Sequence, residues 1–231
     1  MLTIPQNPAA GLASVRERIT VAARSASRDP TGVTLVGVAK SQPLERLRPT
    51  LAAGLADLGE NYVQEARAHF EALAGQSFRR HFIGALQTNK TRDAALLFDW
   101  VHTVDRLRIA ERLSAQRPES IPALDVCLQV QIGGEASKSG VAPAGLAALA
   151  DAVAALPRLR LRGLMCLPPE ETEPARQRLW FAELRQLSEH LNANGHRLDA
   201  LSMGTSGDFE SAIAEGATHV RIGTAVFGAR V

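Results

Sequence analysis

Two kinds of segment alternate along this chain. Short runs that are apolar or β-branched are followed by longer stretches whose apolar residues recur at helical spacing, as do Leu12, Val15 and Ile19. The short runs predict eight strands, at residues 33–39, 56–59, 80–83, 100–103, 123–132, 160–166, 200–203 and 219–222. The longer stretches predict helices at residues 8–25, 43–54, 61–74, 88–97, 105–116, 143–155, 172–194 and 206–215, with a last short helix from about residue 224.

This alternation predicts an α/β protein built as a single (β/α)8 TIM barrel with an extra N-terminal helix. Eight strand–helix units in 231 residues are typical of that fold, and the continuously apolar runs suit strands buried on both faces of a parallel sheet. The alternative is a doubly wound open sheet. That fold usually has a glycine-rich loop after its first strand, where this chain has Ser41-Gln42-Pro43. Because no linker rich in Pro, Gly or Ser divides the chain, we expect one domain over residues 1–231.

Composition narrows the function classes. The chain is 45% hydrophobic and 22% charged, as soluble globular proteins are. A net charge of +2 without a basic cluster, together with 4% aromatic residues, argues against a nucleic-acid binder. We find no secretory signal and no apolar run long enough for a membrane span, and Cys127 and Cys166 look like buried thiols of a reducing compartment. We therefore expect a cytoplasmic protein without a membrane partner and, lacking CxxC and HExxH patterns, without a metal site.

Lysine is rare here, with only Lys40, Lys90 and Lys138 among 26 basic residues. All three fall in loops that follow predicted strands, the end of a barrel where active sites lie. Lys40 directly ends the first strand, and its amine can form a Schiff base with an aldehyde, which an arginine cannot do. The alternative is a strand-end lysine that extends into solvent. Lys90 and Lys138 are either a positive rim that attracts an anion or solvated loop residues.

The loops after the seventh and eighth strands form a candidate phosphate site. Ser206 follows Gly204 in the first loop, and Gly223 precedes Thr224 in the second. Glycines let the backbone approach an anion, and hydroxyls and helix N-termini donate hydrogen bonds to it. Barrel enzymes frequently bind phosphate at these two loops. The alternative is that Ser206 and Thr224 only cap the helices that follow.

A Schiff-base lysine and a phosphate site on one face suggest pyridoxal 5′-phosphate (PLP), which carries both an aldehyde and a phosphate. Arg221 ends the eighth strand and can donate to the pyridine nitrogen, which it would hold unprotonated because arginine keeps its own proton. A strand-end surface charge is the alternative for Arg221. Asn61 either contacts the cofactor or caps a helix, and His81, at the start of a strand, is expected to be structural.

These segments together resemble the YggS/PROSC family of pyridoxal phosphate homeostasis proteins. Seven blocks carry the resemblance in order: residues 37–43 (GVAKSQP), 58–65 (LGENYVQE), 81–90 (HFIGALQTNK), 137–140 (SKSG), 161–165 (LRGLM), 201–206 (LSMGTS) and 220–230 (VRIGTAVFGAR). Two departures are small: Ala39-Lys40-Ser41 stands where the family more often has Ser-Lys-Thr, and Thr205 stands where Met is common.

The resemblance implies a barrel similar to the N-terminal domain of alanine racemase, with PLP linked to Lys40. It implies phosphate contacts from the loop at Ser206 and from Gly223 and Thr224, and a pyridine contact from Arg221. The cofactor-binding residues that we expect are Lys40, Asn61, Met203, Ser206, Arg221, Gly223 and Thr224, and we expect no catalytic residue.

The resemblance also implies a monomer that carries and buffers PLP in vitamin B6 homeostasis, with apo PLP-dependent enzymes as recipients and no established turnover. The alternative is a PLP-dependent racemase or lyase. Alanine racemase, however, uses a further β domain and a tyrosine from a dimer partner as its second base, whereas this chain ends at Val231 and has only Tyr62, after the second strand. A third alternative is a phosphosugar-binding barrel enzyme that uses the same phosphate site without an imine.

Overall fold

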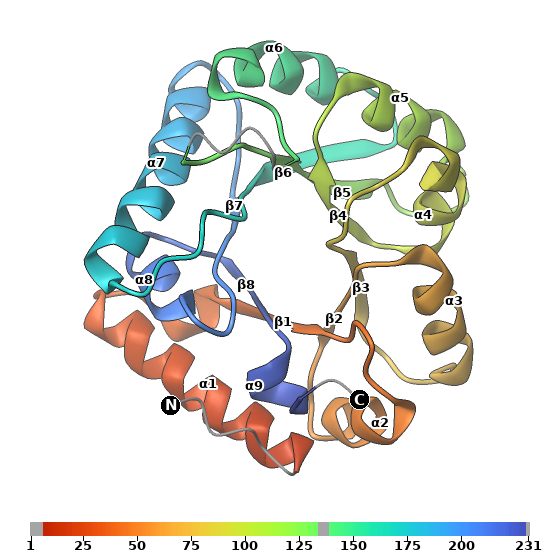
Figure 1. Cartoon of the computed structure of the whole chain (residues 1–231). Coiled ribbons are helices and arrows are strands. Elements are labelled where there is room, and N and C mark those ends of the chain that lie inside the picture. Colours follow the sequence, from red (N-terminus) through yellow and green to blue (C-terminus); the bar gives the residue numbers. More distant parts are fainter. Residues whose placement is uncertain (1–6, 134–138, 230–231) are drawn as a thin grey trace.

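The computed structural model describes residues 7–133 and 139–229. Within them, eight parallel strands close into a barrel in chain order, and β1 pairs with β8 to complete it. Helices surround the strands, and the N-terminal helix α1 packs beside α8 and α9, so the first and the last described helices lie side by side (Figure 1). The predicted (β/α)8 barrel with an extra N-terminal helix is thus confirmed.

The strands follow the predicted runs to within about three residues at each end. They are β1 (Thr34–Val38), β2 (Asp57–Glu60), β3 (Arg79–Phe82), β4 (Trp100–Val104), β5 (Leu124–Gln129), β6 (Leu159–Met165), β7 (Ala200–Ser202) and β8 (His219–Ile222). The α-helices are α1 (Pro8–Ser25), α2 (Leu44–Ala52), α3 (Val63–Ala72), α4 (Thr91–Leu97), α5 (Leu107–Gln116), α6 (Pro143–Ala154), α7 (Pro174–Ala193), α8 (Phe209–Ala214) and α9 (Thr224–Phe227). Short 3-10 helices lie at η1 (Pro30–Gly32) and η2 (Thr88–Lys90). No described helix has both the length and the apolar character needed to cross a membrane.

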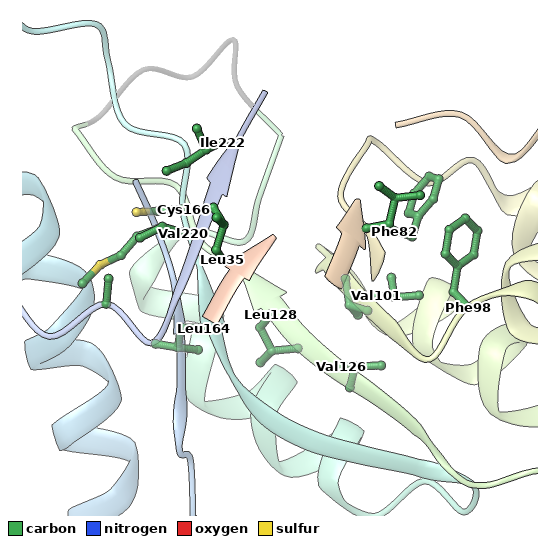
Figure 2. Close-up of a cluster of buried hydrophobic side chains, with 14 of the residues drawn as sticks. Leu35, Phe82, Phe98, Val101, Val126, Leu128, Leu164, Cys166, Val220 and Ile222 are labelled. Atoms are coloured by element: carbon green, nitrogen blue, oxygen red, sulfur yellow. The ribbon is translucent and has the colours of Figure 1, made fainter. Parts of the chain in front are cut away.

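The main hydrophobic core lies between the strands and the helices. Alternate strand residues face outward, and Val101, Leu128 and Val220 belong to this layer. Phe82 and Phe98 pack edge to face there, with ring centroids 5.2 Å apart (Figure 2). Burial of this layer holds the helices against the barrel.

The barrel interior is much more polar than this outer layer. It holds a small apolar cluster of Trp100, Cys127, Met165 and Ala200. Fully buried histidines from β3 and β4 and a nearly buried arginine from β8 also lie there. Since barrel interiors are usually filled with branched aliphatic side chains, this composition indicates that the interior has a role beyond packing.

The carboxyl end of β2 holds a buried ion pair. The carboxylate of Glu60 is inaccessible to solvent, and one of its oxygens lies 2.6 Å from Nδ1 of His69 in α3. Burial raises the pKa of Glu60, and the hydrogen bond to Glu60 raises the pKa of His69. Both groups therefore hold a proton more tightly in the folded chain than in the unfolded chain.

We predict that this pair makes stability depend on pH. A histidine whose folded pKa is raised contributes stability fully below its unfolded pKa of about 6.5 and loses it as pH rises through the folded pKa. His69→Gln should therefore lower the free energy of unfolding by about 1–2 kcal/mol in mildly acidic buffer and by much less in alkaline buffer. Urea unfolding at both pH values measures this, with His190→Gln on the exposed face of α7 as the control. A loss that grew with pH would contradict the assignment.

Candidate cofactor site at the strand ends

Six of the seven expected cofactor-binding residues gather at one pocket. Its volume is about 380 Å³, within the usual range for small-ligand sites. The loops and strand ends of β1, β2, β3, β6, β7 and β8 line it, through Val38, Lys40, Asn61, Ile83, Leu167, Thr205, Ser206, Arg221, Gly223 and Thr224. We call this the strand-end pocket. Met203 does not line it: that side chain is fully buried, and its backbone N–H donates to the carbonyl of His219.

Lys40 enters the pocket from a constrained turn after β1. Its amine lies 5.3 Å from the ring centroid of Tyr62, over the ring face. The next residue, Ser41, has a left-handed backbone (φ 54°), and its N–H donates to a carboxylate oxygen of Glu65 at 2.5 Å. That conformation is costly for a residue other than glycine, so the bond to Glu65 compensates for strain in the turn that directs Lys40.

Asn61 is held in place by a close approach of two loops. A Cβ added at Gly84 would lie 2.1 Å from the carbonyl oxygen of Asn61, so only glycine fits beside it. The side-chain oxygen of Asn61 is buried and has no hydrogen-bond partner. A buried acceptor without a donor costs free energy, so this oxygen is suited to a ligand that brings a donor.

Two hydroxyls that line the pocket, those of Ser206 and Thr224, are free of partners within the described chain. Neither Ser206 nor Thr224 caps a helix: α8 begins after Asp208 and α9 after Gly223, without a side-chain cap bond at either start. The expectation that Ser206 begins a helix is wrong. Asp208 instead accepts hydrogen bonds from the backbone N–H (2.6 Å) and the hydroxyl (2.9 Å) of Thr205, which closes a turn before the helix starts. The capping alternative for the two hydroxyls is therefore excluded.

The turn at residues 203–208 also requires its glycine. Gly204 has φ +94°, and a Cβ there would lie 2.7 Å from Cβ of Ala212 and 2.9 Å from Cα of Phe209. The loop is thus pressed onto α8, which leaves the Ser206 side of the turn facing the pocket. Such a compact turn with the free hydroxyl of Ser206 suits an anion.

Arg221 lies at the base of the pocket and is not a surface charge. It is only 4% exposed. One terminal nitrogen donates to Oγ of Ser202 at 2.8 Å, and the other donates to the carbonyl of Cys166 at 2.9 Å. Burial lowers the pKa of this guanidinium, although arginine remains charged at neutral pH. A fixed cation with N–H donors to spare therefore lies among the pocket-lining side chains.

Of the two remaining lysines, the structure describes Lys90 but not Lys138. Lys90 lies at the end of η2 and lines a neighbouring pocket of about 350 Å³ that shares Asn61 with the strand-end pocket. Its role as a rim residue stays a prediction. Lys138 lies outside the described residues.

The cysteines are free thiols, and the acidic groups near the site have partners in the chain. Cys127 and Cys166 are fully buried free thiols, as expected, and burial raises the pKa of each to about 12. Glu60, Glu65 and His69 offer metal-ligand atoms within 4.8 Å of one another. Each already has a partner in the chain, through the Glu60–His69 pair and the Glu65–Ser41 bond.

Comparison with known proteins supplies the family. Residues 11–231 match the family described as the N-terminal domain of alanine racemase. A "Pyridoxal phosphate homeostasis protein" of Pseudomonas aeruginosa is 55% identical over 230 residues, which cover 100% of this chain and 97% of that protein. The protein of the same name from Escherichia coli is 49% identical over 225 residues, 95% of each chain.

Solved structures agree with these sequence matches. PipY of Synechococcus elongatus, solved with PLP bound, superposes with a TM-score of 0.84 at 36% identity and covers 96% of this chain and 100% of its own. Alanine racemase from Corynebacterium glutamicum superposes with a TM-score of 0.71 at 18% identity, over 94% of this chain and 62% of the racemase, and so shares the fold. By its sequence and its barrel, the chain belongs to the family of pyridoxal phosphate homeostasis proteins, within the larger group built on the N-terminal domain of alanine racemase.

Proposed function

We propose that this chain binds PLP in the strand-end pocket and carries and buffers it as part of vitamin B6 homeostasis. The observation that carries the proposal is the convergence of an amine, a buried guanidinium and two unpartnered hydroxyls on one cavity. PLP has an aldehyde, a ring nitrogen and a phosphate. The relatives named for pyridoxal phosphate homeostasis and the PLP-bound PipY structure support the same ligand.

The residues present fit this cofactor. Lys40 would hold it covalently as a Schiff base, through a bond between Nζ and the aldehyde carbon that forms with loss of one water. Ser206, Gly223 and Thr224 would hold the phosphate, and Arg221 would donate to the ring nitrogen. The buried side-chain oxygen of Asn61 would accept a hydrogen bond from a donor group of the cofactor. PLP supplies the capacity to bind amines and stabilise carbanions.

Three features favour carriage over catalysis. An arginine donor at the ring nitrogen keeps that nitrogen unprotonated, which weakens the electron sink that most PLP chemistry needs. Tyr62 presents its ring face, not its hydroxyl, to the amine of Lys40. The pocket is also open to solvent, since its lining residue Leu167 is 41% exposed and Tyr62, beside the amine of Lys40, is 53% exposed. This suits exchange of the ligand with solvent or with a recipient enzyme.

The proposal includes the cellular setting. Two buried free thiols suit a reducing compartment, and we propose a cytoplasmic monomer that delivers PLP to apo PLP-dependent enzymes. Nucleic acid and membranes are not part of this proposal.

The covalent link is tested by reduction. The purified chain with PLP should be yellow, and borohydride followed by peptide mass mapping should fix the label on Lys40. Lys40→Ala should lose the label completely, because no other lysine lines the described pocket. Lys90→Ala is the matched control and should be labelled like the parent protein. A colourless protein, or a label on another residue, would refute the assignment.

The phosphate contacts are tested by comparing PLP with pyridoxal, which lacks the phosphate. Removing both hydroxyls in a Ser206→Ala, Thr224→Val double variant should reduce the preference for PLP about tenfold or more, since each hydrogen bond to a charged group contributes about 1.5–3 kcal/mol. The exposed Thr172, which does not line the pocket, supplies the control variant Thr172→Val. An unchanged preference in the double variant would place the phosphate elsewhere.

A measurement of alanine turnover distinguishes carriage of PLP from catalysis. The PLP-loaded chain should interconvert L- and D-alanine no faster than the same concentration of free PLP, as followed by chiral chromatography. Rates well above that of free PLP would replace the carrier proposal with the racemase alternative.

A further inference from the structure

A continuous chain of hydrogen bonds crosses the barrel interior beneath the strand-end pocket. It begins at Arg221, whose guanidinium donates to Oγ of Ser202 at 2.8 Å. Ser202 lies 2.7 Å from Nδ1 of His102, and Nε2 of His102 lies 2.9 Å from Nδ1 of His81. Nε2 of His81 lies 2.8 Å from a carboxylate oxygen of Asp57. We call these five residues the interior chain.

All five members are buried. Ser202, His102 and His81 are inaccessible to solvent, and Arg221 and Asp57 are each 4% exposed. They come from β2, β3, β4, β7 and β8, so the chain links strands on different sides of the barrel. At its far end, both oxygens of Asp57 meet the guanidinium of Arg79, at 2.6 and 2.9 Å. Buried polar groups of this kind are stabilising only when every member has its partner.

The two ends determine the direction of every bond. Arginine can only donate, so Oγ of Ser202 accepts from Arg221. The hydroxyl proton of Ser202 then has one acceptor among its described contacts, Nδ1 of His102. Burial lowers the pKa of His102 well below its ordinary value, which keeps this ring neutral with a single N–H. That N–H is therefore at Nε2 and donates to His81.

A neutral imidazole carries a single N–H, and this rule also fixes the direction of the last two hydrogen bonds. Nδ1 of His81 accepts from His102, so a neutral His81 carries its proton on Nε2 and donates it to Asp57. Burial alone would raise the pKa of Asp57, but hydrogen bonds from His81 and Arg79 outweigh it and lower the pKa. In every hydrogen bond of the interior chain the donor thus lies on the side of the buried cation and the acceptor on the side of the buried carboxylate.

Arg221 depends on the interior chain because no carboxylate pairs with its guanidinium. Within the described residues, its two hydrogen bonds go to a hydroxyl and a backbone carbonyl, and it forms no ion pair. An unpaired charge in a protein interior is expensive unless fixed dipoles compensate it. The aligned hydroxyl and imidazole dipoles present their negative ends toward Arg221, and the series ends on a full negative charge at Asp57.

We propose that Ser202, His102, His81 and Asp57 are positioning residues that hold the guanidinium of Arg221 in orientation toward the ring nitrogen of the bound cofactor. The inference rests on the proposed function for the identity of the ligand. The direction of the interior chain, however, is a property of the protein alone.

The first test measures the tautomers without any ligand. Nitrogen-15 NMR of the histidine-labelled protein at neutral pH should show His81 and His102 neutral, each with its proton on Nε2 and slow exchange with solvent. His81→Gln and His102→Gln proteins assign the two signals. A proton on Nδ1 of His102, or an imidazolium at either ring, would overturn the interior chain whether or not PLP binds.

The second test asks whether the interior chain affects cofactor binding through Arg221. Affinity is measured for PLP and for 1-deaza-PLP, in which carbon replaces the ring nitrogen. The parent protein should prefer PLP about tenfold, the size of one good hydrogen bond. Ser202→Ala should abolish most of that preference, and Asp57→Asn, at the far end, should lower it in the same direction. A purely structural role would weaken both ligands equally and leave their ratio unchanged.

Cys127→Ala is the matched control. Cys127 is fully buried in the same interior but outside the interior chain, so this variant should keep the preference for PLP. Loss of the preference in Cys127→Ala, or its retention in Ser202→Ala, would overturn the proposal. Failure of the parent protein to bind PLP would refute the proposed function, whereas equal binding of both ligands would refute only the contact made by Arg221. If Ser202→Ala does not fold, the tautomer measurement still decides.

Discussion

The burial of a guanidinium inside a closed barrel is the constraint on which the rest of this site depends. Arg221 sits near the carboxyl end of β8, with almost no exposure to water and no carboxylate beside it within the described residues. A cation in that position must be surrounded by oriented dipoles or lose its charge, and arginine does not lose its charge. The polar interior of this barrel, unusual for the fold, follows from that requirement.

The second constraint is the closure of the sheet, which brings loops that are distant in sequence to one face. Lys40 from the first unit and Thr224 from the last line the same pocket because β1 pairs with β8. Local devices then aim each side chain: the bond from Ser41 to Glu65, the close approach of Gly84 to Asn61, and the turn closed by Asp208. These contacts hold the amine of Lys40, the amide of Asn61 and the hydroxyl of Ser206 in position around the pocket.

Much of the fold could be predicted from the sequence, because short apolar or β-branched runs alternate with longer stretches of helical spacing along the chain. The search for polar residues at or after the end of each predicted strand identified Lys40, Ser206 and Arg221. It succeeded because all carboxyl ends of a parallel barrel share one face. The start of α8 was misplaced, since Ser206 and Asp208 are both good capping residues and only the contact of Asp208 with Thr205 decides between them.

The interior chain could not be predicted in the same way. His102 and Ser202 are 100 residues apart, and neither belongs to a local motif whose spacing indicates contact. His81 looked like an ordinary strand residue, and its inward direction appears only when the register of β3 in the barrel is known. Met203 was placed with the cofactor residues through its loop, but its side chain turns into the core. Side-chain direction at the ends of short strands is decided by packing, which the linear pattern does not record.

The most direct test of the central claim is a crystal structure of the chain soaked with PLP. We expect continuous electron density from Nζ of Lys40 to the cofactor and the phosphate against Ser206, Gly223 and Thr224. The ring nitrogen should lie within hydrogen-bond distance of Arg221, whose bond to Ser202 is retained. A cofactor bound elsewhere, or one in this pocket with its ring nitrogen turned away from Arg221, would contradict the central claim.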